Sequence, residues 1–159
     1  MSPVGKLLIV EDEPEIRELL TETLADSVEE IQTANDGLEA LEKIRKNKFD
    51  AILSDINMPR MDGMSFLRQL RVEGILTPFV VLTGHGDKKT AIEALRLNAF
   101  DFLDKPWKVE EVKDVITRAI ELGLQYNEWT SDPDLVEGLQ NIRTENATEA
   151  IYRLKKSQT

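Results

Sequence analysis

The chain of 159 residues is 41% hydrophobic, which is enough to build one domain around an apolar core. Its 30 acidic residues against 20 basic ones give a formal net charge of −10, which disfavours direct binding to nucleic acid and favours divalent cations and basic partner surfaces. The lack of cysteine excludes disulfides and thiolate chemistry, and the first apolar run, residues 7–10, is too short for a signal peptide or a membrane span. We therefore expect a cytoplasmic protein without a membrane partner.

Short apolar runs alternate with segments of helical periodicity from residue 6 to residue 126. The runs cover residues 7–10, 31–33, 51–54, 79–82 and 100–103. Several are uniformly apolar, which is typical of strands covered on both faces. After each run, apolar residues recur every three or four positions and predict a helix, with stripes that include, in chain order, Leu19, Leu38, Leu67, Leu95 and Ile116.

Capping residues support these helices. Asp36-Gly37 precedes the second helix and Asp62-Gly63 the third, while Asn98 follows the fourth, where a left-handed cap is expected. Strands that alternate with helices predict an α/β fold, a doubly wound parallel sheet with helices on both faces. Ligands of such sheets bind beyond the carboxyl ends of the strands.

Polar residues follow four of the apolar runs. Glu11 and Asp12 follow the first run, Asp55 the third, Thr83 the fourth and Lys105 the fifth. Each of them alone is consistent with a strand that leaves the core for solvent. Because the carboxyl ends of parallel strands lie at one edge of the sheet, the combination predicts a shared site.

The predicted site has the groups for phosphoryl transfer. Clustered carboxylates need a hard cation such as Mg²⁺, and a carboxylate can act as the nucleophile that forms an aspartyl-phosphate. Asp55 has the central position for the nucleophile, with Glu11 and Asp12 as metal ligands. Lys105 and Thr83 are placed to stabilise phosphoryl oxygens.

These motifs resemble those of a known family. They read LIVEDE at residues 8–13, DINMPRMDG at 55–63, TGHG at 83–86 and DKP at 104–106. In order and spacing they resemble the response-regulator receiver domain of two-component phosphorelays, so we assign residues 1–126 to a receiver domain. The resemblance implies a flavodoxin-like five-stranded sheet of order 2-1-3-4-5, and a cis bond between Lys105 and Pro106. It also implies that Asp55 is phosphorylated by a histidine kinase or a phosphotransfer protein, with Mg²⁺ held by Glu11, Asp12, Asp55 and the carbonyl of Asn57.

The resemblance further implies a switch. Thr83 would move toward the phosphoryl group and Phe102 would turn inward behind it, although Phe102 can also be an ordinary core aromatic. The fourth helix, fifth strand and fifth helix would then form the face that binds a downstream protein or a second copy of the chain, with Lys88, Lys89 and Trp107 as candidate contacts. Trp107 can equally be a packed loop residue.

Two features depart from the resemblance or lie outside it. His85, two residues after Thr83, is either a solvent-facing loop residue or a modulator of water attack on the aspartyl-phosphate. Residues 127–159 read as a linker and a C-terminal helix, which can pack on the receiver, mediate self-association or begin a further domain.

Three other functions fit the sequence less well. A flavodoxin-like mononucleotide site is disfavoured because the acidic loop at residues 11–15 would repel a phosphate. A metal-dependent phosphatase is disfavoured because Asn57 stands where that family's pattern has an acid-base carboxylate, so we expect no enzyme beyond self-phosphorylation and slow autodephosphorylation. A receiver-like module that is never phosphorylated is disfavoured by the complete set of site residues.

Overall fold

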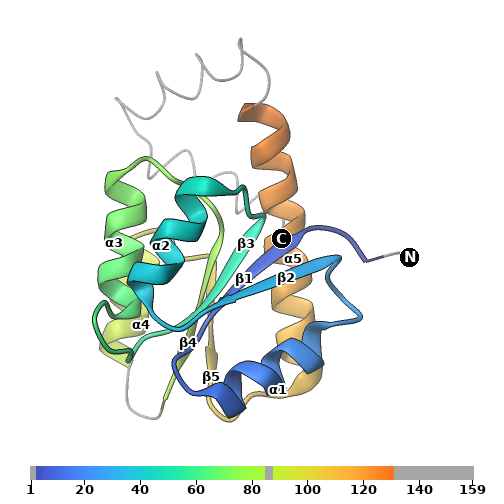
Figure 1. The fold of residues 1–159 in the computed structure, drawn as a ribbon, viewed down its shortest axis with the longest axis horizontal. Helices are drawn as coiled ribbons and strands as arrows, with labels where there is room; N and C mark the ends of the chain where they lie inside the picture. The colour runs from blue at the N-terminus through green and yellow to red at the C-terminus, as the bar shows by residue number, and fades with distance from the viewer. Residues whose placement is uncertain (1–2, 85–87, 131–159) are drawn as a thin grey trace.

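A five-stranded parallel sheet organises the computed structural model, which describes residues 3–84 and 88–130 (Figure 1). Its strand order is β2-β1-β3-β4-β5, as predicted. The strands are β1 (Lys6–Val10), β2 (Glu30–Ala34), β3 (Ala51–Asp55), β4 (Phe79–Thr83) and β5 (Asp101–Asp104). The helices are α1 (Pro14–Leu24), α2 (Gly37–Lys46), α3 (Gly63–Val72), α4 (Lys88–Arg96) and α5 (Val109–Thr130).

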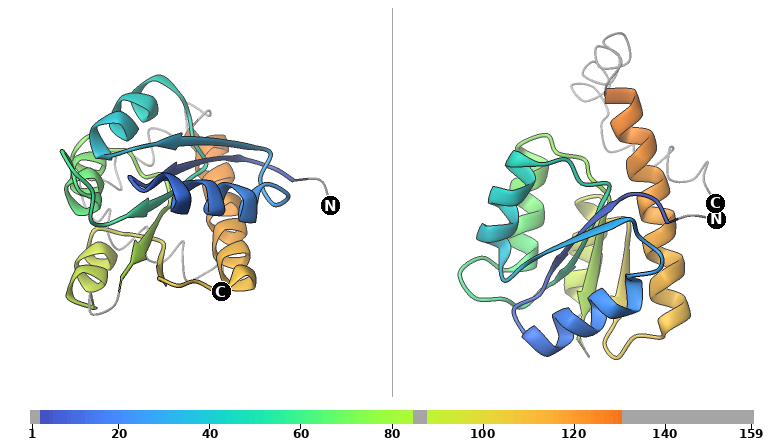
Figure 2. Two further views of the ribbon diagram at one scale, coloured as in Figure 1. Left: turned by 60° about the horizontal axis from the view of Figure 1, so that its bottom comes forward. Right: turned by 45° about the vertical axis from the view of Figure 1, so that its right-hand side comes forward.

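The helices form one layer on each face of the sheet (Figures 1 and 2). Helices α2, α3 and α4 cover one face, and α1 and α5 cover the other. Alternate residues of β1 therefore enter different cores: Leu8 packs with the first group of helices, and Leu7 and Ile9 with the second. Because both faces are covered, the central strands are apolar at nearly every position.

The predicted helix caps are confirmed. The carboxylate of Asp36 accepts a hydrogen bond from the Glu39 N–H at the start of α2, and that of Asp62 accepts one from the Ser65 N–H at the start of α3. Asn98 has φ 62°, the left-handed conformation expected after α4. These caps fix where each helix begins or ends relative to the strand beside it.

The apolar stripes are narrower than predicted. Leu19 is 52% exposed, whereas the adjacent Leu20, and Leu24 one turn later, are fully buried. Side chains of consecutive residues on a helix point about 100° apart, so only one of two consecutive leucines can point directly at the sheet. Two further predicted stripe members are exposed as well: Leu38 on α2 and Leu95 on α4.

Helix α5 extends through Thr130, so residues 127–130, which we expected in the linker, are helical. Its second half is tied to the sheet by Asp50, which precedes β3 and whose carboxylate accepts hydrogen bonds from the Asn127 side chain at 2.6 Å and the Lys6 N–H at 2.7 Å. None of the described helices is both long and apolar enough to cross a membrane. The rest of the predicted linker, the C-terminal helix and His85 lie outside the described residues.

Candidate functional site

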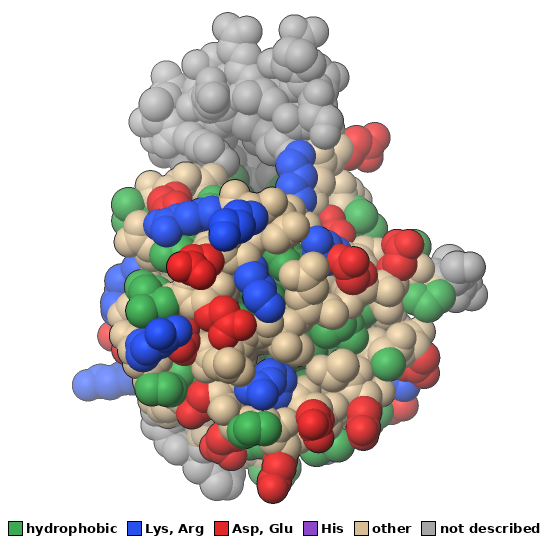
Figure 3. All heavy atoms as spheres, in the orientation of Figure 1, with side chains coloured by type: hydrophobic (Ala, Val, Ile, Leu, Met, Phe, Trp, Pro, Cys, Tyr) green, Lys and Arg blue, Asp and Glu red, His purple; other side chains and the backbone are tan. Residues whose placement is uncertain are grey.

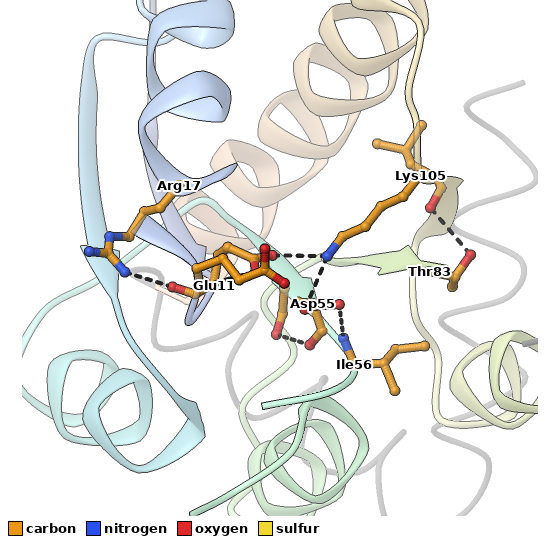
Figure 4. A network of polar contacts seen from close by, with 9 residues as sticks. Glu11, Arg17, Asp55, Ile56, Thr83 and Lys105 are labelled. Atoms are coloured by element: carbon orange, nitrogen blue, oxygen red, sulfur yellow. Dashed lines mark hydrogen bonds and ion pairs between the residues drawn. The ribbon is translucent and has the colours of Figure 1, made fainter. Parts of the chain in front are cut away.

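The polar residues singled out in the sequence meet at one edge of the sheet, as predicted (Figure 4). Glu11 directly follows β1, Asp55 ends β3 and Thr83 ends β4. Lys105 follows β5 and extends across this edge toward the acidic residues. The parallel topology thus brings together side chains that are up to 94 residues apart in the chain.

Three carboxylates form the acidic centre of the site. Carboxylate oxygens of Glu11, Asp12 and Asp55 all lie within 4.8 Å of one another. Glu11 is fully buried and Asp55 is 6% exposed, while Asp12 is half-buried and open to solvent. Burial in a poorly solvated environment makes the repulsion among such groups costly, so the cluster requires positive charge.

Lys105 supplies part of that charge. Its Nζ lies 3.1 Å from Asp55 Oδ2 and 3.4 Å from Glu11 Oε2. Partial burial lowers the pKa of Lys105, but the two carboxylates outweigh that effect and raise it above its ordinary value. The ammonium is therefore firmly charged and bridges the two buried acids.

Glu11 has a strongly raised pKa. Burial raises the pKa of Glu11 to about 7, and the negative charge of Asp55 acts in the same direction, against the lowering effect of Lys105. The Glu13 N–H donates to Glu11 Oε1 at 3.3 Å, and Arg17 Nη1 donates to the Glu11 carbonyl at 2.9 Å. These contacts hold the Glu11 segment in place beside Asp55.

Asp55 is held in a defined orientation. The Ile56 N–H donates to Asp55 Oδ1 at 2.8 Å, while Oδ2 faces Lys105. The adjacent helix α3 approaches closely because it begins with glycine: a Cβ on Gly63 would lie 2.2 Å from the Asp55 carbonyl oxygen. The site thus presents a carboxylate with one oxygen beside a cation and the other bonded to the main chain.

Thr83 is buried at the same edge, with its hydroxyl engaged elsewhere. Its Oγ1 donates to Asp104 Oδ1 at 3.1 Å and lies 3.4 Å from the Leu103 carbonyl. The Lys105 N–H donates to the Thr83 carbonyl at 2.7 Å, so the β4 and β5 ends are joined at this point. The predicted cis bond between Lys105 and Pro106 is confirmed.

The remaining predicted residues lie outside the central cluster. Asn57 is exposed in the loop between β3 and α3. Phe102 is 40% exposed on the edge strand β5, so it is not a core aromatic. Trp107 packs against the core between the sheet and helices α1 and α5, which supports its alternative interpretation as a packed loop residue. Lys89 is exposed on α4.

Two neighbours of the site were not predicted from the sequence. Asp104 contacts Thr83. This residue could have been predicted from the sequence, because it ends β5 and immediately precedes Lys105. Arg60 is the other: its guanidinium Nε lies 2.6 Å from Asp36 Oδ2 and ties the loop after Asp55 to the start of α2. Nothing in the local pattern of residues 55–63 pointed to this partner.

The acidic cluster has the donor set for Mg²⁺. All three side chains offer hard oxygen ligands, which Mg²⁺ prefers. Ligands on opposite sides of a Mg²⁺ ion stand about 4.2 Å apart, since each metal–oxygen bond is about 2.1 Å long. Oxygens within 4.8 Å of one another therefore fit a shared ion after small side-chain rotations, with water completing its coordination.

Comparison with known proteins agrees with this geometry. Residues 7–117 match the family described as "Response regulator receiver domain". The regulatory protein AtoC of Escherichia coli strain K12 is 36% identical over 122 residues, which are 77% of this chain and 26% of AtoC. The response regulator MprA of Mycobacterium leprae is 33% identical over 159 residues, covering 94% of this chain and 70% of MprA.

A solved structure gives the same result. The chemotaxis response regulator CheY4 of Vibrio cholerae is 36% identical, with a TM-score of 0.67 over 73% of this chain and 98% of CheY4. The chain spans only about a quarter of the length of AtoC, so the match with AtoC concerns one domain of a longer protein. Together, the sequence match, the sheet order and the acidic edge establish that the chain belongs to the response regulator receiver domain family of two-component signalling proteins.

Proposed function

We propose that this chain is a phosphorylation-dependent switch in which Asp55 accepts a phosphoryl group from a histidine kinase or a phosphotransfer protein. The observation that carries this proposal is the Lys105 bridge between Asp55 and Glu11 inside a cluster of three carboxylates. An acidic cluster with one central carboxylate and one inward cation suits an aspartyl-phosphate better than it suits a neutral ligand.

Each residue of the site has a separate proposed role in phosphoryl transfer. Glu11, Asp12 and Asp55 would hold Mg²⁺ together with the main-chain carbonyl of Asn57, and the bound ion would neutralise charge on the transferred group. The carboxylate of Asp55 attacks phosphorus as the bond to the donor histidine breaks. Lys105, which already faces Asp55 Oδ2, then pairs with a phosphoryl oxygen.

The switch would follow from a change at Thr83. Its hydroxyl is 3.1 Å from Asp104 in this structure and would reorient to donate to a phosphoryl oxygen after transfer. Phe102 on β5 would turn inward from its exposed position and alter the surface formed by α4, β5 and α5. That surface, which includes Lys89, would bind the downstream protein or a second copy of the chain.

The output lies with a partner or with a further domain. The face drawn in Figure 3 intersperses Lys and Arg with Asp and Glu, and the net charge of −10 disfavours nucleic-acid binding by this chain itself. We also propose a cytoplasmic location, which suits the lack of cysteine and the family to which the chain belongs. AtoC is named a regulatory protein, so regulation of a downstream process is the output proposed.

Turnover of a separate substrate is not proposed. Asn57 is exposed two residues after Asp55, in the position where a phosphatase would need an acid-base carboxylate. The domain would therefore catalyse only its own phosphorylation and a slow autodephosphorylation, in which His85 is proposed to influence the approach of water.

Beryllofluoride, a phosphoryl mimic, tests the proposal. The chain has two tryptophans, so Trp129→Phe leaves Trp107, two residues after Lys105, as a single reporter. Fluorescence should change on adding beryllofluoride with Mg²⁺, and this change should vanish in Asp55→Asn. A half-buried acid of β5 gives the matched control, since Asp101→Asn should respond like the parent chain. A response that persists in Asp55→Asn would refute the proposal.

A further inference from the structure

We infer that Asp104 is a positioning residue that holds the Thr83 hydroxyl in its resting orientation and so limits how readily the switch engages a phosphoryl group. The inference rests on the proposed function, because it concerns the energy that phosphorylation of Asp55 must supply. It gives Asp104 a role beyond those of the metal ligands, the phosphoacceptor and Lys105.

The contact arises from strand register. Thr83 and Asp104 are cross-strand partners and are the last residues of β4 and β5. Directly opposite residues of neighbouring strands place their side chains on the same face, within reach of each other. The Thr83 Oγ1 donates to Asp104 Oδ1 at 3.1 Å, and its second acceptor, the Leu103 carbonyl, is farther away at 3.4 Å.

A hydroxyl has a single proton to donate. While the Thr83 proton is directed at Asp104, it cannot be donated to a phosphoryl oxygen on Asp55. A hydrogen bond to a charged acceptor is stronger than one between neutral groups, so it stabilises the resting rotamer more than the Leu103 carbonyl alone would. The free energy of the contact is therefore a cost of switching, and removing the acceptor should make switching easier.

Asp104 is also linked to the phosphoryl site through its neighbour. The next residue, Lys105, donates its N–H to the Thr83 carbonyl at 2.7 Å and places its Nζ 3.1 Å from Asp55. The segment that restrains the Thr83 side chain thus also carries Lys105, the cation proposed to pair with a phosphoryl oxygen. Because Asp104 is exposed while Thr83 is 3% exposed, removing the Asp104 carboxylate should leave the core intact.

A double-mutant cycle tests the inference in the Trp129→Phe chain with saturating Mg²⁺. The measured quantity is the beryllofluoride concentration that gives half of the Trp107 fluorescence change. Asp104→Ala should lower it about tenfold, equivalent to about 1.4 kcal/mol. In a Thr83→Ala background, Asp104→Ala should have no effect, because no hydroxyl remains to be held.

Two further variants separate the hydrogen bond from general electrostatics. Asp104→Asn keeps an acceptor oxygen without the charge and should shift the midpoint less than Asp104→Ala does. Asp101→Ala removes a carboxylate of the same strand that accepts from the Phe102 N–H and has no contact with Thr83, and it should not shift the midpoint. Thermal unfolding of each variant, without beryllofluoride, should match that of the parent chain and so confirm an intact fold.

Each outcome supports or overturns a defined part of the account. An unchanged midpoint in Asp104→Ala, or a shift that persists without the Thr83 hydroxyl, overturns the inference and leaves the proposed function standing. Equal shifts in Asp104→Ala and Asp101→Ala, or in Asp104→Ala and Asp104→Asn, also overturn it, since charge alone would explain them. If the parent chain itself shows no Asp55-dependent response, the proposed function fails and the inference fails with it.

Discussion

Replacing Gly123 by alanine should destabilise the domain, although the same change usually stabilises a helix. Gly123 lies in α5, where it contacts the residue before β3. A Cβ at this position would lie 1.6 Å from the Asp50 carbonyl oxygen, 2.5 Å from the Asp50 carbonyl carbon and 2.8 Å from the Asp50 Cα. All three are backbone atoms, and the Asp50 N–H is itself bonded to the Lys6 carbonyl at 2.8 Å. The helix must therefore move away from the sheet.

The size of the effect follows from the contacts that are lost. Overpacking costs about 1–3 kcal/mol or more, and separation of α5 from the sheet weakens the charge-assisted bond between Asn127 and Asp50, worth about 1.5–3 kcal/mol. The gain in helix propensity offsets about 1 kcal/mol. We expect a net loss of about 2–4 kcal/mol, a large part of the roughly 5–15 kcal/mol that stabilises a typical domain.

Thermal and urea unfolding of the full chain measure this loss. At about 4 °C per kcal/mol for a domain of this size, the midpoint should fall by about 10 °C. Gly84→Ala is the control, because no atom of the described residues lies within 4 Å of a Cβ built there, and it should leave the midpoint nearly unchanged. An unchanged or higher midpoint in Gly123→Ala would refute the close contact between α5 and the sheet.

Three further changes test the surroundings of the site. Lys105→Met leaves Asp55 and Glu11 without their shared cation, so the metal-free domain should lose about 3 kcal/mol of unfolding free energy in urea. Added Mg²⁺ should then raise the unfolding midpoint of this variant more than that of the unmodified chain. Equal rises in the two midpoints would contradict the pairing of Lys105 with the two carboxylates. The hydrogen bond from Arg60 holds the pKa of the Asp36 carboxyl below its ordinary 3.8. The unmodified chain should therefore be more stable than Arg60→Met, with the full difference in unfolding free energy present above about pH 4. This difference should shrink as the pH falls through the lowered pKa of Asp36. Denaturant unfolding of both chains from pH 3 to 7 measures this difference in stability. A difference that grows toward low pH would contradict the ion pair between Arg60 and Asp36. Gly63→Ala would place a Cβ 2.2 Å from the Asp55 carbonyl oxygen, so it should slow phosphorylation by acetyl phosphate at least tenfold, and a normal rate would show that the loop tolerates the change.

The sequence was sufficient to predict the sheet and the edge at which the site lies. Alternating apolar runs and helical stripes established the β-α repeats, and the polar residues that follow four of the runs then had to lie at the carboxyl edge. Glu11, Asp55 and Lys105 are in contact for this reason, because parallel strand ends fix their positions with little dependence on side-chain detail.

Contacts between distant loops could not be predicted in the same way. Arg71 donates to four main-chain carbonyls, two of them at Leu97 and Asn98 after α4, and burial lowers the pKa of Arg71 to about 10. Main-chain carbonyls have no sequence signature, so a clamp of this kind is visible only in three dimensions. The pairing of Arg60 with Asp36 depends similarly on the left-handed conformation of Arg60, with φ 64°.

Side-chain orientation could not be predicted from the sequence either. Thr83 was correctly located at the site edge, but periodicity carries no information on whether its hydroxyl faces Asp55 or Asp104. The exposure of Phe102 likewise follows from the position of β5 at the edge of the sheet, where α4 leaves part of the strand uncovered. Rotamers of this kind are set by tertiary contacts, and the proposed switch depends on them.

Intact-mass measurement after incubation with acetyl phosphate and Mg²⁺ tests the central assignment most directly. The chain should gain one phosphoryl group, and this gain should be absent in Asp55→Asn and when Mg²⁺ is removed with a chelator. Modification of Asp55→Asn to the same extent, or no modification of the unaltered chain, would contradict the assignment of Asp55 as the phosphoryl acceptor.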